Sequence, residues 1–225
     1  MAEINIIHGD CMEAMAKMKD KEFDLAIVDV PFGINADSNA YKNGQMCKSN
    51  GFKEHRNGQW DKSAPKQEYF NELFRITENQ IIFGANHFIS KINKDSSCWL
   101  IWNKVQRGFS FADAELAWTS FSTAVRCFDY ARGNDSGFAP KLKGMARIGI
   151  NIHPTQKPVA LYQWLLKNYA KQGDKILDTH LGSGSSAIAA DIMGFDFTGY
   201  EIDKDYYEAA LDRFNRHKQQ LVMEF

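Results

Sequence analysis

The sequence predicts one α/β domain built on a mostly parallel, doubly wound sheet. Its 225 residues and 44% hydrophobic content suit a single large domain with a sizeable core. Short apolar runs alternate with amphipathic segments, as strands alternate with helices in such sheets. Two of the runs end in polar or glycine-rich turns, at residues 29–33 and 179–186. Open α/β sheets bind ligands at the carboxyl ends of their strands, so we expect a site where these turns meet.

The amino-terminal part of the chain contains two predicted strands. Residues 4–7 form a short apolar run, and residues 23–28 (Phe-Asp-Leu-Ala-Ile-Val) form a longer one. A short helix is expected over residues 12–18, because its methionines lie mostly on one face. Residues 34–64 show no periodicity, and an irregular segment of this length in a compact domain often carries function.

The middle of the chain predicts a helix followed by several strands. Residues 66–79 have an apolar stripe at helical spacing. Residues 111–121 fit either a helix or a strand, and residues 131–152 are irregular. The expected strands lie at residues 80–84, 98–103 and 124–130.

The carboxyl-terminal part is the most regular. A helix is expected over residues 158–170, with Pro158 near its first turn and Gly173 after its end. Its remaining elements are a strand at 175–178, a small-residue helix at 187–193, a strand at 195–200 and a last helix at 204–220.

The turn Asp29-Val30-Pro31-Phe32 closes the strand at residues 23–28 and is the first candidate for chemistry. A carboxylate and a main-chain carbonyl can accept both hydrogens of an exocyclic amine, while an aromatic ring stacks on the face of the flat group that carries it. Pro31 fixes φ and so directs these groups to one side. A turn of this composition also occurs as simple strand punctuation, so the motif alone is a weak signal.

A glycine loop near the carboxyl end is the second candidate. Asp178 ends a strand, the loop Gly182-Ser183-Gly184 follows, and Glu201 stands at the end of the next strand, 23 positions after Asp178. An acid at that place can accept both hydroxyls of a ribose. The third glycine of a dinucleotide motif is missing, and a nucleoside cofactor without a pyrophosphate would not require it. The alternatives are a glycine turn that only joins strand to helix, and a helix-capping role for Asp178.

The order of the two motifs is informative. A standard dinucleotide fold has its glycine loop on the first strand, whereas here the loop lies in the last fifth of the chain. Joining the carboxyl-terminal unit to the strand at residues 4–7 would restore the usual succession of strands. We therefore predict a circularly permuted fold, which is feasible because domain termini often lie close together.

With these motifs in this order, the chain resembles the amino-directed DNA methyltransferases of the permuted β group. It looks most like the small adenine methylases of phages and restriction-modification systems. The resemblance implies a Rossmann-like, S-adenosylmethionine-dependent methyltransferase fold over residues 1–225, with inserted DNA-recognition loops. It rests on His8-Gly9-Asp10, Asp29-Val30-Pro31-Phe32, His153-Pro154-Thr155-Gln156-Lys157-Pro158, Asp178-Thr179-His180-Leu181-Gly182-Ser183-Gly184 and Gly199-Tyr200-Glu201-Ile202-Asp203.

The resemblance assigns roles to these motifs. In the catalytic turn, Asp29 and the Val30 carbonyl would hold the amine of a flipped base, and Phe32 would stack on it. The implied product is N6-methyladenine in double-stranded DNA, made at a short specific site by direct in-line displacement. The residues implied to bind S-adenosylmethionine are Asp10, Thr155, Lys157, Asp178, Gly182, Ser183, Gly184 and Glu201.

Two positions depart from the family pattern. Val30 replaces the first proline of Asp-Pro-Pro-aromatic, but the contact expected there comes from a carbonyl that valine retains. We therefore expect activity to survive with a looser turn. His180-Leu181 stands where Phe-X or Pro-X is frequent, which leaves the shape of the pocket open.

Basic residues gather in two segments, although the net charge of the chain is only −1. Residues 40–66 carry six Lys or Arg against two Asp or Glu, and residues 126–147 carry five against two. The segments at 34–64 and 126–152 are either solvated basic loops or the parts that track phosphates and read the target. The candidate DNA contacts are Lys42, Lys53, Arg56, Arg107, Arg126, Arg132, Lys141 and Lys143.

The sequence also bears on the state of the cysteines, on metal binding and on cellular location. The cysteines have no close pairs and the histidines avoid metal-ligand spacings, so we expect reduced thiols and no metal site. No apolar stretch is long enough for a membrane span and no signal peptide is visible, which predicts a cytoplasmic protein. It would be a monomer or a homodimer.

Four other functions stay open at this point. The protein could be a cytosine-N4 DNA methyltransferase, although Asp at position 29 favours adenine over cytosine. It could be a DNA-binding relative with weakened catalysis, for which Val30 would be the sign. A methyltransferase for protein glutamine or a small molecule would not need the basic segments. A nicotinamide oxidoreductase is disfavoured by the glycine loop and the motif order.

Overall fold

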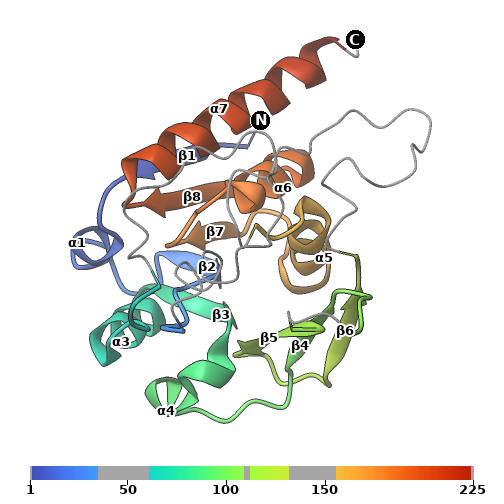
Figure 1. The fold of residues 1–225 in the computed structure, drawn as a ribbon. Coiled ribbons are helices and arrows are strands. Elements are labelled where there is room, and N and C mark those ends of the chain that lie inside the picture. Colours follow the sequence, from blue (N-terminus) through green and yellow to red (C-terminus); the bar gives the residue numbers. More distant parts are fainter. Residues whose placement is uncertain (1, 35–60, 109–111, 132–155, 224–225) are drawn as a thin grey trace.

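The computed structural model describes residues 2–34, 61–108, 112–131 and 156–223, with no side-chain description beyond 220. These residues form an eight-stranded sheet in the order β1-β8-β7-β2-β3-β5-β4-β6, with helices on both faces (Figure 1). The strands are β1 (Ile4–His8), β2 (Phe23–Val28), β3 (Thr77–Phe83), β4 (Leu100–Asn103), β5 (Ala114–Thr119), β6 (Arg126–Asp129), β7 (Lys175–Asp178) and β8 (Asp196–Glu201).

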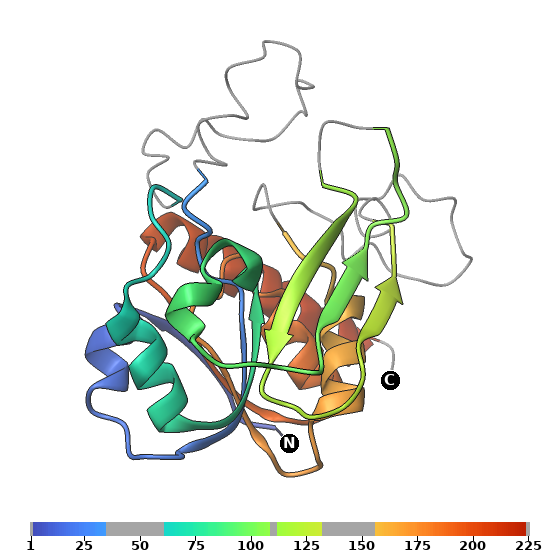
Figure 2. The same cartoon turned by 90° about the horizontal axis from the view of Figure 1, so that it is seen from below.

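The helices follow the alternation that the sequence predicts. On one face of the sheet lie α1, α3 and α4, and on the other lie α5, α6 and α7 (Figures 1 and 2). Their bounds are α1 (Cys11–Met15), α3 (Gln67–Ile76), α4 (Ile89–Ile92), α5 (Val159–Tyr169), α6 (Ser185–Met193) and α7 (Lys204–Met223), with a 3₁₀ turn η1 (Ala85–His87) before α4.

The central strands are apolar throughout because both faces of the sheet are covered. In β2, Leu25 and Ile27 pack with the α5 and α6 side, while Ala26 and Val28 pack with the α1 and α3 side. All four side chains are buried. A continuous apolar run is the expected pattern for a parallel strand that is buried on both faces.

The permuted order predicted from the motifs is confirmed by the sheet. The first strand, β1, pairs in parallel with β8, so that Ile4 lies opposite Phe197 and His8 opposite Glu201. The start of the chain therefore completes the unit formed by its end. From β7 the chain moves outward to β8, whereas from β2 it moves the other way to β3. The sheet thus has its switch point between β7 and β2, where open α/β sheets place their ligands.

One strand runs against the others. β5 is antiparallel to both β3 and β4, which resolves the ambiguous segment at residues 111–121 as a strand. Its first residues consequently lie at the same edge of the sheet as the last residues of β2 and β4. This reversal decides which side chains of β5 reach the site.

The predicted helix at residues 66–79 is wrong at its end. The helix stops at Ile76 and β3 begins at Thr77, three residues earlier than expected. Thr77 lies opposite Phe23 in the β2–β3 ladder, and its hydroxyl donates to the Leu73 carbonyl at 2.6 Å. Pairing with the neighbouring strand therefore overrides the local helical pattern, which a single segment of sequence does not show.

Candidate active site

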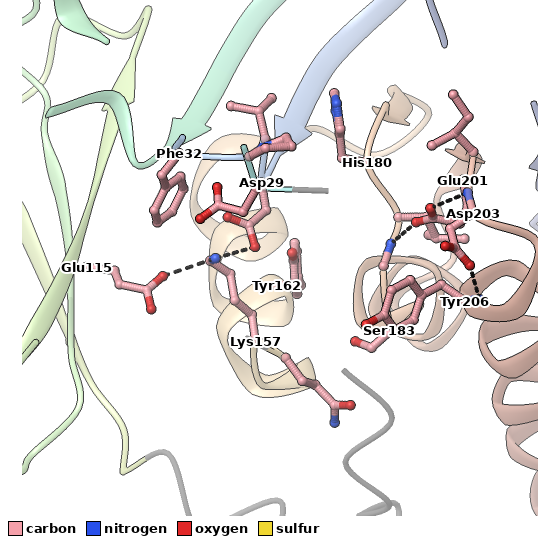
Figure 3. Close-up of a pocket in the computed structure, with 17 residues that line it drawn as sticks. Asp29, Phe32, Glu115, Lys157, Tyr162, His180, Ser183, Glu201, Asp203 and Tyr206 are labelled. Carbon is pink, nitrogen blue, oxygen red and sulfur yellow. Dashed lines mark hydrogen bonds and ion pairs between the residues drawn. The ribbon is translucent and has the colours of Figure 1, made fainter. Parts of the chain in front are cut away.

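A cavity of about 240 Å³ opens at the carboxyl edge of the sheet, at the switch point. One end is formed by the turn after β2 and the other by the glycine loop and the end of β8 (Figure 3). Its lining residues are Asp29, Val30, Pro31, Phe32, Asp61, Glu115, Gln156, Lys157, Tyr162, His180, Leu181, Gly182, Ser183, Glu201, Ile202, Asp203 and Tyr206.

The turn after β2 is held in place by its neighbours. The Gly33 amide donates to the buried Asp61 carboxylate at 2.8 Å. The ring of Phe32 stacks on His87, with centroids 5.1 Å apart and planes 15° apart. That position requires Gly84, where φ is +70° and an added Cβ would lie 2.0 Å from the Phe32 ring. All four predicted turn residues line the cavity. The Phe32 ring packs directly against Gly84.

Asp29 takes part in a chain of alternating charges that the sequence did not indicate. The Lys157 ammonium pairs with Asp29 Oδ2 and lies 3.0 Å from Glu115 Oε2 (Figure 3). Glu115 Oε1 in turn lies 2.8 Å from the ammonium of Lys104. We call these four residues the charge chain. Its members come from the ends of β2 and β4, the start of β5 and the segment before α5.

Burial and charge act in opposite directions on the two acids of this chain. Burial raises the pKa of Asp29, and the adjacent Lys157 ammonium opposes that rise. For Glu115, burial also acts to raise the pKa, but the ammonium groups of Lys157 and Lys104 outweigh it and lower the pKa to about 2. Glu115 is therefore a fixed negative charge, while Asp29 is the more easily protonated acid.

The opposite end of the cavity is built from backbone hydrogen bonds. Glu201 accepts from the amide of Gly182 at 2.8 Å and from the amide of Asp203 at 2.9 Å (Figure 3). Gly182 and Gly184 have φ of +54° and +73°, which favours glycine at both positions. Arg213 donates to the Ser183 carbonyl at 2.8 Å from beneath the loop. Each Glu201 oxygen accepts one amide, so both retain capacity for a diol.

Asp178 is hydrogen-bonded to the loop but is not among the residues that line the cavity. Its Oδ1 accepts from the His180 amide at 3.0 Å, and its Oδ2 accepts from the Ser186 hydroxyl at 2.6 Å. The side chain is buried, and this burial raises its pKa to about 7 despite the two hydrogen bonds. The structure therefore gives Asp178 a role in shaping the loop, and the N-cap of α6 is Gly184, not Asp178.

His180, at a position that departs from the family pattern, lines the cavity between its two ends (Figure 3). Its Nδ1 lies 2.9 Å from the Thr179 hydroxyl, which lies 2.7 Å from the hydroxyl of Tyr69. Burial lowers the pKa of His180 to about 4, against the opposing charge of Asp10. The cavity is therefore bounded here by a neutral imidazole.

Two other predicted cofactor residues have structural partners. Asp10 is the N-cap of α1 and accepts from the Met12 amide at 2.7 Å, and it does not line the cavity. Lys157 lines the cavity, but its ammonium meets Asp29 and Glu115 at the end away from the glycine loop. Their cofactor roles stay predictions, and Thr155 lies outside the described residues.

The predicted DNA contacts are divided by the fold. Arg107 is exposed between β4 and β5, at the same edge of the sheet as Asp29. Arg126 is also exposed, but it begins β6 opposite Leu100 and so lies at the other edge. The structure gives Arg126 no place beside the cavity, because β6 runs parallel to β4. The remaining predicted contacts, Lys42, Lys53, Arg56, Arg132, Lys141 and Lys143, lie outside the described residues.

Some site residues were missed by sequence reasoning. Asp203 was part of a quoted motif without a role, although it lines the cavity and its carboxylate caps α7. Tyr206 follows in α7 and Tyr162 lies in α5, both at positions that a helical stripe explains equally well. Glu115 lay in the ambiguous segment, and only the reversed direction of β5 brings it to the cavity.

Metal binding by a cluster of acidic, His or Cys side chains and membrane insertion both lack support within the described ranges. No group of three His, Cys, Asp or Glu residues there is arranged to hold a metal ion. No helix in those ranges is both long and apolar enough to cross a membrane.

The chain matches known DNA methylases in sequence. Residues 90–212, more than half of the chain, match the family model described as DNA methylase. The Type II methyltransferase M2.MboI of Moraxella bovis is 22% identical over 254 residues, which cover 98% of this chain and 91% of that protein.

Two solved structures share the fold. The M1.HpyAVI–SAM complex matches 96% of this chain and 100% of its own, with 22% identity and a TM-score of 0.55. The cytosine-N4-specific PvuII DNA methyltransferase matches 95% of this chain and 87% of its own, with 11% identity and a TM-score of 0.59. A protein crystallised with SAM and a protein named for cytosine-N4 methylation therefore both have this fold.

Proposed function

Since the chain belongs to the DNA methylase family, we propose that it methylates the N6 amine of adenine in double-stranded DNA, with S-adenosylmethionine as the methyl donor. The observation that carries the proposal is the arrangement of one cavity. The Asp29 carboxylate and the Phe32 ring lie at one end of it together with Val30, and a glycine loop with a buried acid forms the other (Figure 3).

The Asp29 end suits a flipped base. An exocyclic amine is a poor nucleophile because its lone pair is delocalised into the ring. Accepting its two hydrogens, through the Asp29 carboxylate and the Val30 carbonyl, favours a more tetrahedral and more nucleophilic nitrogen. Phe32 lines the same end and can stack on the base, which would return about 1–3 kcal/mol of the cost of unstacking it.

The glycine-loop end fits the nucleoside part of the donor. Glu201 would hold the ribose hydroxyls beside the Gly182–Gly184 loop, where the missing third glycine is no obstacle because the donor has no pyrophosphate. When bound, S-adenosylmethionine supplies a methyl group on a positively charged sulfur, ready for in-line displacement. The contribution of the protein is then to position the amine and exclude competing geometries. No covalent enzyme intermediate is required.

A direct test is to incubate the protein with unmethylated duplex DNA and labelled S-adenosylmethionine, and to identify the labelled nucleoside. We expect N6-methyladenine, and no product from Asp29→Ala, which removes the acceptor for the amine. Label transfer that does not depend on DNA would overturn the proposal in favour of a protein or small-molecule substrate. Duplex binding without turnover would identify a relative that has lost catalysis.

Cytosine-N4 methylation is the second candidate, because the fold is shared with a cytosine-N4-specific enzyme. The Asp29 end can hold any exocyclic amine on a flat ring, so the geometry alone favours neither base. Asp at position 29 supports adenine as the first choice. Identifying the methylated nucleoside separates the two candidates. Exclusive formation of N4-methylcytosine would refute adenine as the target.

Target reading would fall to the two basic segments, at residues 34–64 and 126–152. The second begins as β6, and most of both lies outside the described residues. Of the predicted DNA contacts within the described residues, Arg107 supports this proposal, because it lies exposed at the edge of the sheet where the cavity opens. A restriction-modification setting is part of the proposal, in keeping with the Type II name of M2.MboI.

A further inference from the structure

The charge chain brings together four groups that lie far apart in the sequence. Lys157 stands at its centre, with only 2% of its side chain exposed, between the carboxylates of Asp29 and Glu115. Lys104, with 7% exposed, holds the outer oxygen of Glu115. Removing one partner from a buried ion pair leaves an uncompensated charge, so such groups hold one another in place.

The geometry assigns different tasks to the two oxygens of Asp29. Lys157 takes Oδ2, so Oδ1 is the oxygen that can accept from a base in the cavity (Figure 3). An aspartate at the end of a strand can otherwise turn about its side-chain bonds. A fixed ammonium on one oxygen removes that freedom and thereby fixes the direction of the other.

We infer that Lys157 and Glu115 are positioning residues for Asp29, a role that rests on the proposed function and adds two members to its machinery. Lys157 orients the Asp29 carboxylate and favours its ionised form. Glu115, itself held by Lys104, keeps the Lys157 ammonium from moving wholly onto Asp29. The chain carries two positive and two negative charges, so it balances without help from solvent.

Positioning Asp29 is a different role for Lys157 from binding the cofactor carboxylate. The two roles differ in what they control. A group that positions Asp29 changes kcat and its dependence on pH, whereas a group that binds only the cofactor changes the cofactor KM. The pH dependence is decisive because Lys157 and Glu115 carry opposite charges and act on Asp29 in opposite directions.

The experiment measures kcat between pH 5 and 9, at saturating DNA and cofactor, for the full chain and its variants. Lys157→Met should lower kcat by about 100-fold at pH 7.5, the order expected for a displaced reacting group. It should also move the acid limb of the profile to higher pH, because a positive charge that favours the Asp29 carboxylate is lost. Glu115→Gln should move the acid limb to lower pH, because a repelling negative charge is lost.

The other titratable groups around Asp29 are unchanged in both variants, so they do not account for opposite shifts. Among the described residues they are Lys104 after β4, Asp178 at the end of β7, Tyr162 on α5, and Asp61 and His180 in the cavity wall. Matched controls are Lys175→Met, at the start of β7, and Glu78→Gln, in β3. Both side chains are exposed near the opposite edge of the sheet, and both variants should keep the wild-type profile.

Conservative substitutions keep the test independent of folding. Glu115→Gln preserves side-chain shape, and Lys157→Arg preserves the charge and should keep the acid limb within the wild-type range. Shifts of Lys157→Met and Glu115→Gln in the same direction, or no shift in either of these two variants when it is folded, would overturn the inference. So would a higher cofactor KM in Lys157→Met with an unchanged kcat. A wild-type protein without DNA methylation would instead refute the proposed function itself.

Discussion

The two ends of the cavity are built in different ways. At the glycine-loop end, the contacts join residues close in sequence: Gly182 and Asp203 to Glu201, and His180 and Ser186 to Asp178. At the Asp29 end, the contacts join residues from four distant segments through charged side chains. The first end is formed by one β-loop-α-β unit and the helix that follows it, and the second exists only when the whole sheet has assembled.

This difference predicts how the ends respond to substitution. Changes at the loop end should weaken cofactor binding or alter stability, because its acids mostly hold backbone. Changes at the Asp29 end should alter turnover, because its side chains hold one another in a reactive arrangement.

Gly84→Ala should have the largest effect. The new Cβ would overlap the Phe32 ring, with the nearest ring atom 2.0 Å away, so the ring must leave its place against His87. We expect kcat for DNA methylation to fall by about 100-fold. The positive φ adds about 1–2 kcal/mol of strain, seen as a lower free energy of unfolding.

Gly194→Ala is the matched control for this change. Its φ is +75°, but an added Cβ would meet nothing within 4 Å. It should therefore show a similar loss of stability with an unchanged kcat. Equal kcat for both variants would mean that the seat of Phe32 does not matter for turnover.

Asp178→Asn should change the pH dependence of stability. The native pKa of about 7 lies above the unfolded value of 3.8, so the native state retains a proton that the unfolded state has lost. The contribution of this acid to stability is therefore full below pH 4 and is lost as pH rises towards 7. The wild type should lose about 2 kcal/mol of unfolding free energy to this group between pH 5 and 7, and the variant should not.

Chemical denaturation at several pH values measures this difference. As pH rises, the unfolding free energy of the wild type should fall progressively relative to that of the variant. Asp196→Asn, an exposed acid at the start of β8, is the control and should leave the slope unchanged. A difference that is constant with pH would show that Asp178 is ionised throughout.

Glu201→Gln should have the smallest effect. The amide retains one oxygen acceptor but loses the charge that favours hydroxyl donors, so we expect the cofactor dissociation constant to rise about 10-fold. Saturating cofactor should restore most of kcat. Calorimetric titration with S-adenosylmethionine measures the affinity, and Glu208→Gln on the exposed side of α7 is the control. A large fall in kcat at saturation would contradict the division between the two ends.

Sequence reasoning anticipated most of the sheet and the loop end for a common reason. The apolar composition of a strand such as Phe23–Val28 is enough to predict that it is buried. The spacing from Asp178 to Glu201 is that of a local β-loop-α-β unit. The predicted ends of elements were less accurate, as Thr77 shows, because strand pairing competes with helical periodicity there.

The sequence by itself determined the alternation of strands and helices, the permuted order, the Asp29 turn and the glycine loop. These depend on periodicity and on contacts between near neighbours, which a linear pattern contains. Only the tertiary structure decided that β5 runs antiparallel, that Glu115 reaches the cavity, that Lys157 pairs with Asp29 and that Arg126 lies at the far edge. The physical reason is that a charge acts through distance in space, and the strand order that sets those distances is a property of the assembled sheet.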